Sequence, residues 1–170
     1  MKKLLLSLCA LPLLTGPAIG QVLAGHNTNA PVDVEADRIE VQDRADRAMF
    51  IGNVRVRQGG LSLSSARLTV AYDSSGSGVE IQRIDASGGV TVSSADQTAQ
   101  GDIALYDLPR RLITVVGGVT LTQGASQVRG SRLVIDLNSG RAVVDGNGIS
   151  SSSNGNGRVT GRFTVSKKAQ

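Results

Sequence analysis

The stretch Ala48–Asp73, AMFIGNVRVRQGGLSLSSARLTVAYD, decides the fold, because apolar and polar residues alternate along most of it. In Val54-Arg55-Val56-Arg57 every second side chain is apolar, which is the pattern of a strand with one buried face. Similar alternation begins at Leu68, Val90, Ile103, Val119 and Leu133. No window keeps its apolar residues at the spacing of an amphipathic helix. The sequence therefore predicts an all-β protein.

The alternating segments also recur at a longer period. Those that begin at Ile39, Leu68, Ile103 and Leu133 are 29, 35 and 30 residues apart, which predicts about four repeats of roughly thirty residues. A glycine pair or Gly-Asn stands before an apolar residue in each repeat: Gly52-Asn53-Val54, Gly88-Gly89-Val90, Gly117-Gly118-Val119 and the longer Gly146-Asn147-Gly148-Ile149. Because glycine and asparagine tolerate positive φ, we predict a tight hairpin at each pair.

The set of alternate residues that is apolar, and so faces inward, changes from even to odd numbers or back at small residues. Apolar residues fall on even numbers in Val32–Ala36 and on odd numbers from Ile39 onward, and similar switches lie across Ser64-Ser65-Ala66 and at Gly130. A strand whose inward face changes has to bend or bulge. We therefore expect long strands that turn a corner and serve two sheets, as in a bent, partly open β-jellyroll. A β-solenoid is the rival architecture, but its rungs are usually shorter and more regular.

The first twenty residues predict a cleaved secretory signal peptide. Lys2 and Lys3 precede the apolar run Leu4–Leu14, which is too short to span a membrane. Small residues place the cleavage after Gly20, with Ala24 as the alternative.

Cleavage would remove Cys9, the only cysteine, so packing and strand pairing would have to hold the mature chain without disulfides. This composition favours a periplasmic location. We expect a polar linker at 21–31, one domain at 32–165 with a flexible loop at 150–157, and a basic tail at 166–170.

Charge and composition argue against several function classes. The formal charge is +4, and about +2 without Lys2 and Lys3, and four aromatic residues without tryptophan form no stacking platform for nucleic acid. His26 is the only histidine and the mature chain would contain no cysteine, so neither a thiol nucleophile nor a His/Cys metal cluster is expected. Carboxylates recur at the ends of repeats, where turn formation explains them: Asp43, Asp73, Asp107 and Asp136. We predict no catalytic residue, metal or cofactor; an enzyme acting on exported polysaccharide is an alternative.

Several short motifs in Val32–Asp73 form a more specific combination. They are Ala36-Asp37 before a strand, Phe50-x-Gly52-Asn53-Val54, Gln58-Gly59 and the closing Tyr72-Asp73. Together they resemble the OstA-like β-jellyroll family of lipopolysaccharide-transport proteins, the family of LptA. Weaker copies extend the resemblance to about residue 148. It implies a V-shaped, partly open jellyroll in the periplasm, whose apolar interior receives the acyl chains of lipopolysaccharide.

The resemblance also implies partners. Lipopolysaccharide or a related glycolipid would be carried from an LptC-like inner-membrane component to an LptD-like outer-membrane translocon, along protomers joined end to end. One alternative is the membrane-anchored LptC-like partner itself, although the short apolar run argues against it. Another is a self-assembling β structural or adhesion protein whose repeats only stack.

The alternation supplies fourteen candidates for the lipid-binding interior: Ile39, Val41, Val54, Val56, Leu68, Val70, Val90, Val92, Ile103, Leu105, Val119, Leu121, Leu133 and Ile135. An ordinary sandwich core is the alternative. Closed sandwiches usually fill their centre with aromatic rings of about 150–250 Å² each. The scarcity of such rings favours an open slot, unless β-branched residues let the sheets approach.

Two further groups are candidates for contacts at the margins of the domain. Arginines beside the apolar positions suit phosphate groups at a head-group rim, although such arginines are more often just the solvated face of a strand: Arg38, Arg55, Arg57, Arg67 and Arg132. A last strand without a successor, with Val159, Phe163 and Val165 on one face, predicts strand addition by another protein chain.

Overall fold

The computed structural model describes residues 27–74, 76, 78–95, 97–146 and 157–164. The predicted signal peptide, His26, the loop before Gly157, Val165 and the basic tail lie outside these residues. The described residues confirm the all-β prediction, with ten strands and one 3-10 turn at Asp43–Ala45: β1 Val32–Glu35, β2 Arg38–Gln42, β3 Arg47–Gln58, β4 Leu61–Asp73, β5 Glu80–Ser94, β6 Gln97–Asp107, β7 Leu112–Gln123, β8 Ser126–Asp136, β9 Arg141–Asp145 and β10 Thr160–Arg162. No helix in this part of the chain is long and apolar enough to cross a membrane.

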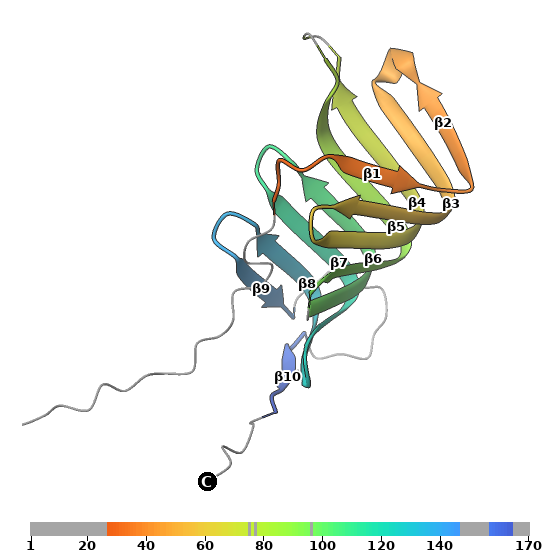
Figure 1. The fold of residues 1–170 in the computed structure, drawn as a ribbon. Coiled ribbons are helices and arrows are strands. Elements are labelled where there is room, and N and C mark those ends of the chain that lie inside the picture. Colours follow the sequence, from red (N-terminus) through yellow and green to blue (C-terminus); the bar gives the residue numbers. More distant parts are fainter. Residues whose placement is uncertain (1–26, 75, 77, 96, 147–156, 165–170) are drawn as a thin grey trace, which may run out of the picture.

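All strands form one antiparallel sheet that is bent sharply along a line across its middle (Figure 1). Its order is β1-β3-β4-β5-β6-β7-β8-β10, while β2 pairs with the other end of β3 and β9 with the other end of β8. The ladders of the long strands break at one level, for example between Ile51 and Val54 and between Val116 and Val119. We call this line the corner. It confirms the bent, partly open jellyroll.

Three of the four glycine motifs form the corner and not hairpins, which corrects one prediction; the fourth lies outside the described residues except for Gly146. Gly52, Gly88 and Gly117 lie inside β3, β5 and β7 with φ of +81°, +86° and +85°. A β-bulge also requires a residue with unusual dihedrals, so it uses the same residue types as a tight turn. The sheet is crowded there, since a Cβ on Gly88 would lie 2.7 Å from the Cβ of Ala66.

The predicted changes of phase are confirmed as points where the chain turns the corner. The β4–β5 register shifts between Ser64 and Arg67, and the β7–β8 ladder breaks beside Gly130. β1 and β2, which flank the first predicted switch, pair with β3 on opposite sides of the corner. The four repeat starts lie in the even-numbered strands β2, β4, β6 and β8, so each full repeat is a pair of long bent strands.

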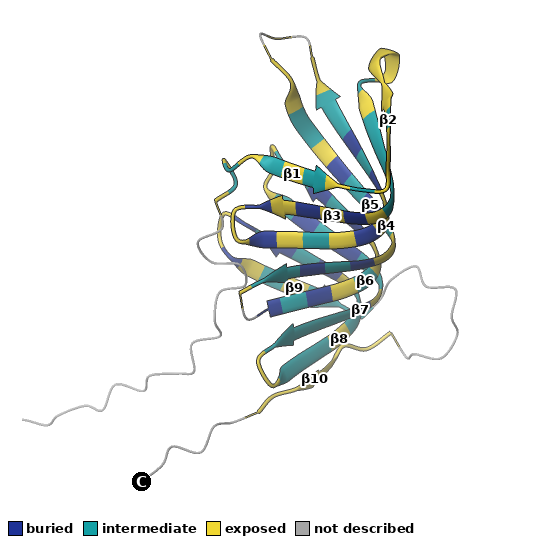
Figure 2. Ribbon diagram, turned by 45° about the vertical axis from the view of Figure 1, so that its right-hand side comes forward, coloured by how far each residue is buried: buried dark blue, intermediate teal, exposed yellow. Residues whose placement is uncertain are grey.

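The corner divides the sheet into two halves that face each other. The β1 half holds β1, β10 and the parts of β3–β8 that pair between them; the β2 half holds β2, β9 and the remaining parts. Buried residues recur at every second position along the central strands β5 and β6 on both sides of the corner, as the alternating colours show (Figure 2). A single cluster of buried apolar side chains fills the space between the inner faces.

Candidate functional site

The register defines which side chains share the inner face, because directly paired residues of antiparallel strands project to the same side. One inner row of the β2 half runs through Phe50, Leu68, Ala86, Ala104, Val115, Leu133 and Val144. An inner row of the β1 half runs through Val34, Val56, Leu63, Val92, Ala99, Leu121 and Val128. The two halves therefore enclose an interior with apolar rows on both walls.

Most of the fourteen interior candidates lie on these walls. Leu121 is half-buried and packs against the buried cluster. Nine further candidates are buried in it: Val54, Val56, Leu68, Val70, Val90, Val92, Val119, Leu133 and Ile135. Their placement agrees with the predicted interior. Lipid binding by these residues stays a prediction.

Ile103 and Leu105 lie on the outer face, contrary to the prediction. Ile103 pairs with Ser87 and is 42% exposed, and Leu105 pairs with Asp85. In this part of β6 the inward residues are Ala104 and Tyr106, which are both buried. Ile-Ala-Leu-Tyr is apolar at all four positions, so alternation does not determine its phase; pairing with β5 does.

Ile39 and Val41 lie on the inner side of the sheet but are not buried. They pair with Phe50 and Ala48, yet their exposed fractions are 54% and 63%. β2 has only β3 as a neighbour, so little covers its inner side. These two residues form an exposed apolar edge of the interior instead of its wall.

The sequence reasoning missed part of the interior. Ile84, Ala86, Ala99, Ala104, Tyr106, Ile113 and Val115 are all buried. The signal for two pairs was present, since Ile84-Asp85-Ala86 and Ile113-Thr114-Val115 also alternate. Gln58 continues the inward phase of Val54 and Val56, but its polar side chain gives no sign in the sequence that it is buried.

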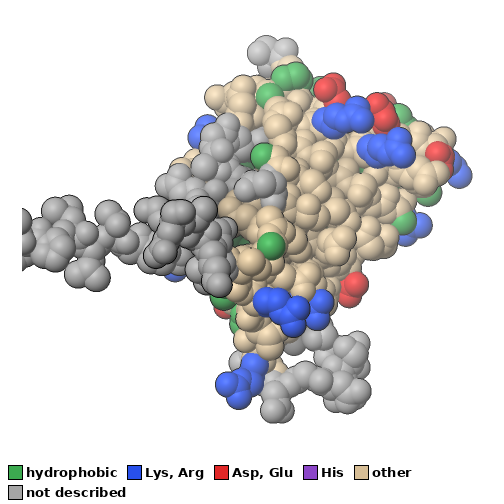
Figure 3. All heavy atoms as spheres, turned by 60° about the horizontal axis from the view of Figure 1, so that its bottom comes forward, with side chains coloured by type: hydrophobic (Ala, Val, Ile, Leu, Met, Phe, Trp, Pro, Cys, Tyr) green, Lys and Arg blue, Asp and Glu red, His purple; other side chains and the backbone are tan. Residues whose placement is uncertain are grey.

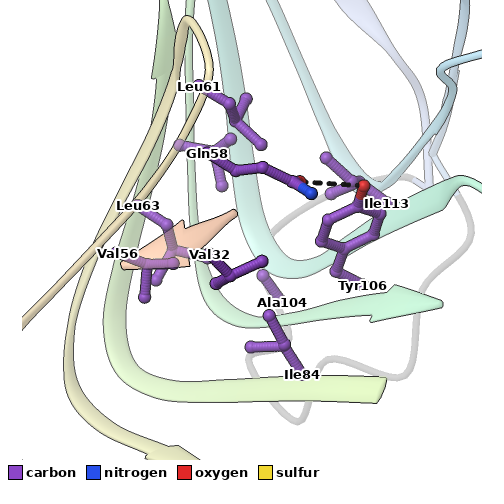
Figure 4. A pocket seen from close by; sticks show the side chains of 10 residues that line it. Val32, Val56, Gln58, Leu61, Leu63, Ile84, Ala104, Tyr106 and Ile113 are labelled. Carbon is purple, nitrogen blue, oxygen red and sulfur yellow. Dashed lines mark hydrogen bonds between the residues drawn. The ribbon is translucent and has the colours of Figure 1, made fainter. Parts of the chain in front are cut away.

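A narrow slot lies between the two halves near β1 (Figure 4). Its lining comes from both halves and is apolar except for Gln58 and the Tyr106 hydroxyl: Val32, Val56, Gln58, Leu61, Leu63 and Val92 from the β1 half, and Ile84, Ala104, Tyr106 and Ile113 from the β2 half. The accessible volume is about 20 Å³, which holds about one water molecule.

Gln58 links the two walls of this slot. The Tyr106 hydroxyl donates a hydrogen bond of 3.1 Å to Gln58 Oε1 across the interior. Gln58 Nε2 donates to the carbonyl oxygens of Thr28 and Ala30, at 3.0 and 3.1 Å. Burial raises the pKa of Tyr106, partly offset by the positive charge of Arg111. The tyrosine is therefore a neutral donor near neutral pH.

The five rim arginines lie on the outer face and not at the mouth of the interior. Arg55 and Arg57 pair with Ser64 and Ser62, and all five arginine side chains are exposed. Arg57 Nη1 lies 3.4 Å from a carboxylate oxygen of Glu35, and Arg38 pairs with Glu40. On the face seen in Figure 3, basic and acidic side chains lie close together and apolar ones are scattered. Head-group binding by Arg38, Arg55, Arg57, Arg67 and Arg132 stays a prediction.

The C-terminal edge has a short strand on it. β10 pairs with β8 through Thr160–Arg129 and Arg162–Gln127. Val159 and Phe163 flank β10 and are exposed, Phe163 at 72%. Strand addition at this edge stays a prediction.

Two of the repeated carboxylates, Asp107 and Asp136, accept hydrogen bonds within turns. Asp107 accepts from the Arg110 backbone N–H at 3.0 Å, and the hydrogen bond from the Arg110 guanidinium lowers its pKa. Asp136 accepts from the backbone N–H of Asn138 at 2.8 Å, and hydrogen bonds led by Ser139 lower its pKa. The described residues include no group of three His, Cys, Asp or Glu side chains placed to hold a metal.

These features define an open, bent antiparallel jellyroll with an apolar interior. Residues 33–141 match the family described as LptA/(LptD N-terminal domain) LPS transport protein. The chain therefore belongs to this family, which is a family of transport proteins and not of enzymes.

Two individual proteins show the likeness as well. The fold is similar to that of LptH from Pseudomonas aeruginosa, the LptA-homologous periplasmic component of its lipopolysaccharide transport device, with a TM-score of 0.70 and 18% identity over 81% of this chain and 98% of LptH. An uncharacterized protein of Rhizobium meliloti (strain 1021) is 35% identical over 66 residues. That match covers 36% of each chain, so this chain matches little more than a third of that relative's length.

Proposed function

We propose that the protein is a periplasmic bridge that binds lipopolysaccharide and carries it from an inner-membrane export complex to an outer-membrane translocon. The observation that supports this role is the interior between the two halves. Both walls are apolar, and a narrow slot lies between them beside β1. An LptC-like donor and an LptD-like acceptor are the partners that this role requires.

The chemistry of the interior suits acyl chains and not polar cargo. Each methylene that leaves water contributes about 0.8 kcal/mol, so a chain of about a dozen carbons gains about 10 kcal/mol. The walls need only be apolar and able to separate. Aliphatic side chains such as Leu63 and Val92 meet the first condition, and no large ring except that of Tyr106 lines the slot.

The edges of the sheet suit an end-to-end assembly. β1 and β10 are the outer strands of one half, and β2 and β9 are those of the other. An edge strand presents unpaired backbone groups that another strand can complete. A second copy added at such an edge would extend the interior into a continuous path.

Photo-crosslinking at adjacent residues on opposite faces tests the lipid path. Leu63 lines the slot and is half-buried, whereas its neighbour Ser62 is exposed on the outer face. We expect p-benzoylphenylalanine at Leu63 to crosslink purified lipopolysaccharide, and the same group at Ser62 to give little product. Equal crosslinking from the two positions, or none from a folded Leu63 variant, would refute an interior path.

A further inference from the structure

β1 forms one side of the slot, and the segment before it is hydrogen-bonded to Gln58, which also lines the slot. Val32 of β1 is part of the slot lining, opposite Ala104 and Tyr106 of the other half (Figure 4). The four residues of β1 pair with only one neighbour, β3, through the register Val32–Gln58 to Glu35–Arg55. β1 is therefore a short cover attached along a single ladder.

One buried side chain connects this cover to both halves of the sheet. Gln58 is only 3% exposed. Its amide nitrogen holds the carbonyl groups of Thr28 and Ala30, and its amide oxygen accepts from Tyr106 of the opposite half. A buried polar group is costly unless it is hydrogen-bonded. These contacts therefore stabilise the closed arrangement relative to an open one in which they are broken.

The closed slot is too small for the cargo of the proposed function. Its volume of about 20 Å³ holds about one water molecule, and an acyl chain is many times larger. Some element has to move before a chain can enter there. β4, β5, β6 and β7 each pair with a long strand on both sides, whereas β1 has one partner and four residues. β1 is the lining element that can leave with the fewest broken ladder contacts.

We propose that residues 28–35 form a lid on the interior, which the hydrogen bonds from Gln58 to the carbonyl oxygens of Thr28 and Ala30 hold shut and which lifts from β3 when an acyl chain enters. The Tyr106 hydroxyl keeps the Gln58 side chain in place for these bonds. This inference rests on the proposed lipid binding and adds a closed state to it. A ligand that binds only the open state shifts the population toward it, and any change that destabilises the closed state strengthens binding.

A reversible crosslink between the lid and β3 provides the test. Asp33 and Arg57 are directly paired on the outer face, away from the slot, so a disulfide at these positions ties β1 to β3 without altering the lining. Ser62 and Ser93 are paired in the same way between β4 and β5 and form the matched control. Each cysteine pair is introduced into a separate protein that also carries Cys9→Ser.

Binding of fluorescently labelled lipopolysaccharide is measured for oxidised and reduced protein. We expect oxidation to weaken binding at least tenfold in the Asp33→Cys/Arg57→Cys protein, reduction to restore it, and the control pair to show no difference. Equal binding by both forms of the lid-locked protein would overturn the lid alone. Binding by neither form of any variant would overturn the lipid-binding function, and the lid with it.

Removing the hydrogen bond that keeps Gln58 in place gives an independent readout. Tyr106→Phe keeps the ring in the slot and deletes only the donor to Gln58. We expect lipopolysaccharide to bind roughly fivefold more tightly, the change that corresponds to losing one net hydrogen bond of about 1 kcal/mol from the closed state. Unchanged or weaker binding by a folded variant would contradict a latch at this position.

Discussion

The two halves of the bent sheet are built from different residues. The four largest fully buried side chains, Leu68, Ile113, Leu133 and Ile135, all lie in the β2 half. The three buried polar residues of the described chain, Gln58, Ser65 and Gln97, all lie in the β1 half. The β2 half therefore has the composition of a packed core, and the β1 half has a mixed wall that is easier to open.

This difference indicates how one domain can combine stability with an interior that opens. Burial of large aliphatic side chains dominates the free energy of folding. If most of that burial lies in the β2 half, then separating the β1 half from it locally need not unfold the protein. The slot and the proposed lid both lie where the wall is mixed.

The largest expected effect compares one leucine in each half. Leu133→Ala removes a fully buried side chain of the β2 half and should lower the free energy of unfolding by about 2–5 kcal/mol. Leu121→Ala, at a half-buried position of the β1 half, should lower it by less than half as much. Urea denaturation of both variants measures the difference. Equal losses would show that the halves contribute alike.

The corner that joins the halves is the next most sensitive place. A Cβ on Gly117 would lie 2.7 Å from the Cβ of Asp102, whereas one on Gly118 would meet nothing within 4 Å. Both residues have positive φ. We expect Gly117→Ala to destabilise by about 1–3 kcal/mol and Gly118→Ala by about 1 kcal/mol. Reversal of that order in thermal or urea unfolding would contradict the crowded corner.

The sequence alone predicted the strands and the bend, because both leave local traces. Alternation follows from burying one face of a strand, and the switches at Ser64-Ser65-Ala66 and Gly130 mark the corner directly. The three glycine pairs at the corner were misinterpreted because hairpins and bulges both need positive φ. Only the pairing of neighbouring strands distinguishes the two uses.

The site was less predictable, because its parts meet through long-range pairing. The inward phase of β6 depends on its register with β5, since Ile103 and Leu105 are as apolar as Ala104 and Tyr106. Gln58 and Tyr106 are 48 residues apart in the sequence. A glutamine before two glycines looks like an ordinary turn residue until the tyrosine of the opposite half is placed over it.

The bond between the halves should leave a trace in the alkaline stability. Because burial raises the pKa of Tyr106 above its usual value of 10.0, its contribution is fully present below pH 10 and is lost as pH rises through the folded-state pKa. Tyr106→Phe cannot ionise, so its free energy of unfolding should fall less steeply above about pH 10. Urea unfolding at about pH 8 and about pH 11 compares the two proteins. Parallel decline would indicate that Tyr106 is not desolvated between the halves.

The smallest expected effect lies at the outer end of the β2 half, in the turn that joins β8 and β9. Hydrogen bonds from Ser139 and Asn138 lower the pKa of Asp136, so its stabilising contribution is present above the ordinary carboxyl pKa of about 3.9 and is lost as pH falls through the folded-state value. Asp136→Asn keeps an acceptor oxygen but no charge. It should be slightly less stable than the parent protein near pH 6, and that deficit should shrink below about pH 4. A deficit that persists in acid would mean that the asparagine disturbs the turn itself, and that the charge of Asp136 contributes nothing to closing this end of the sheet.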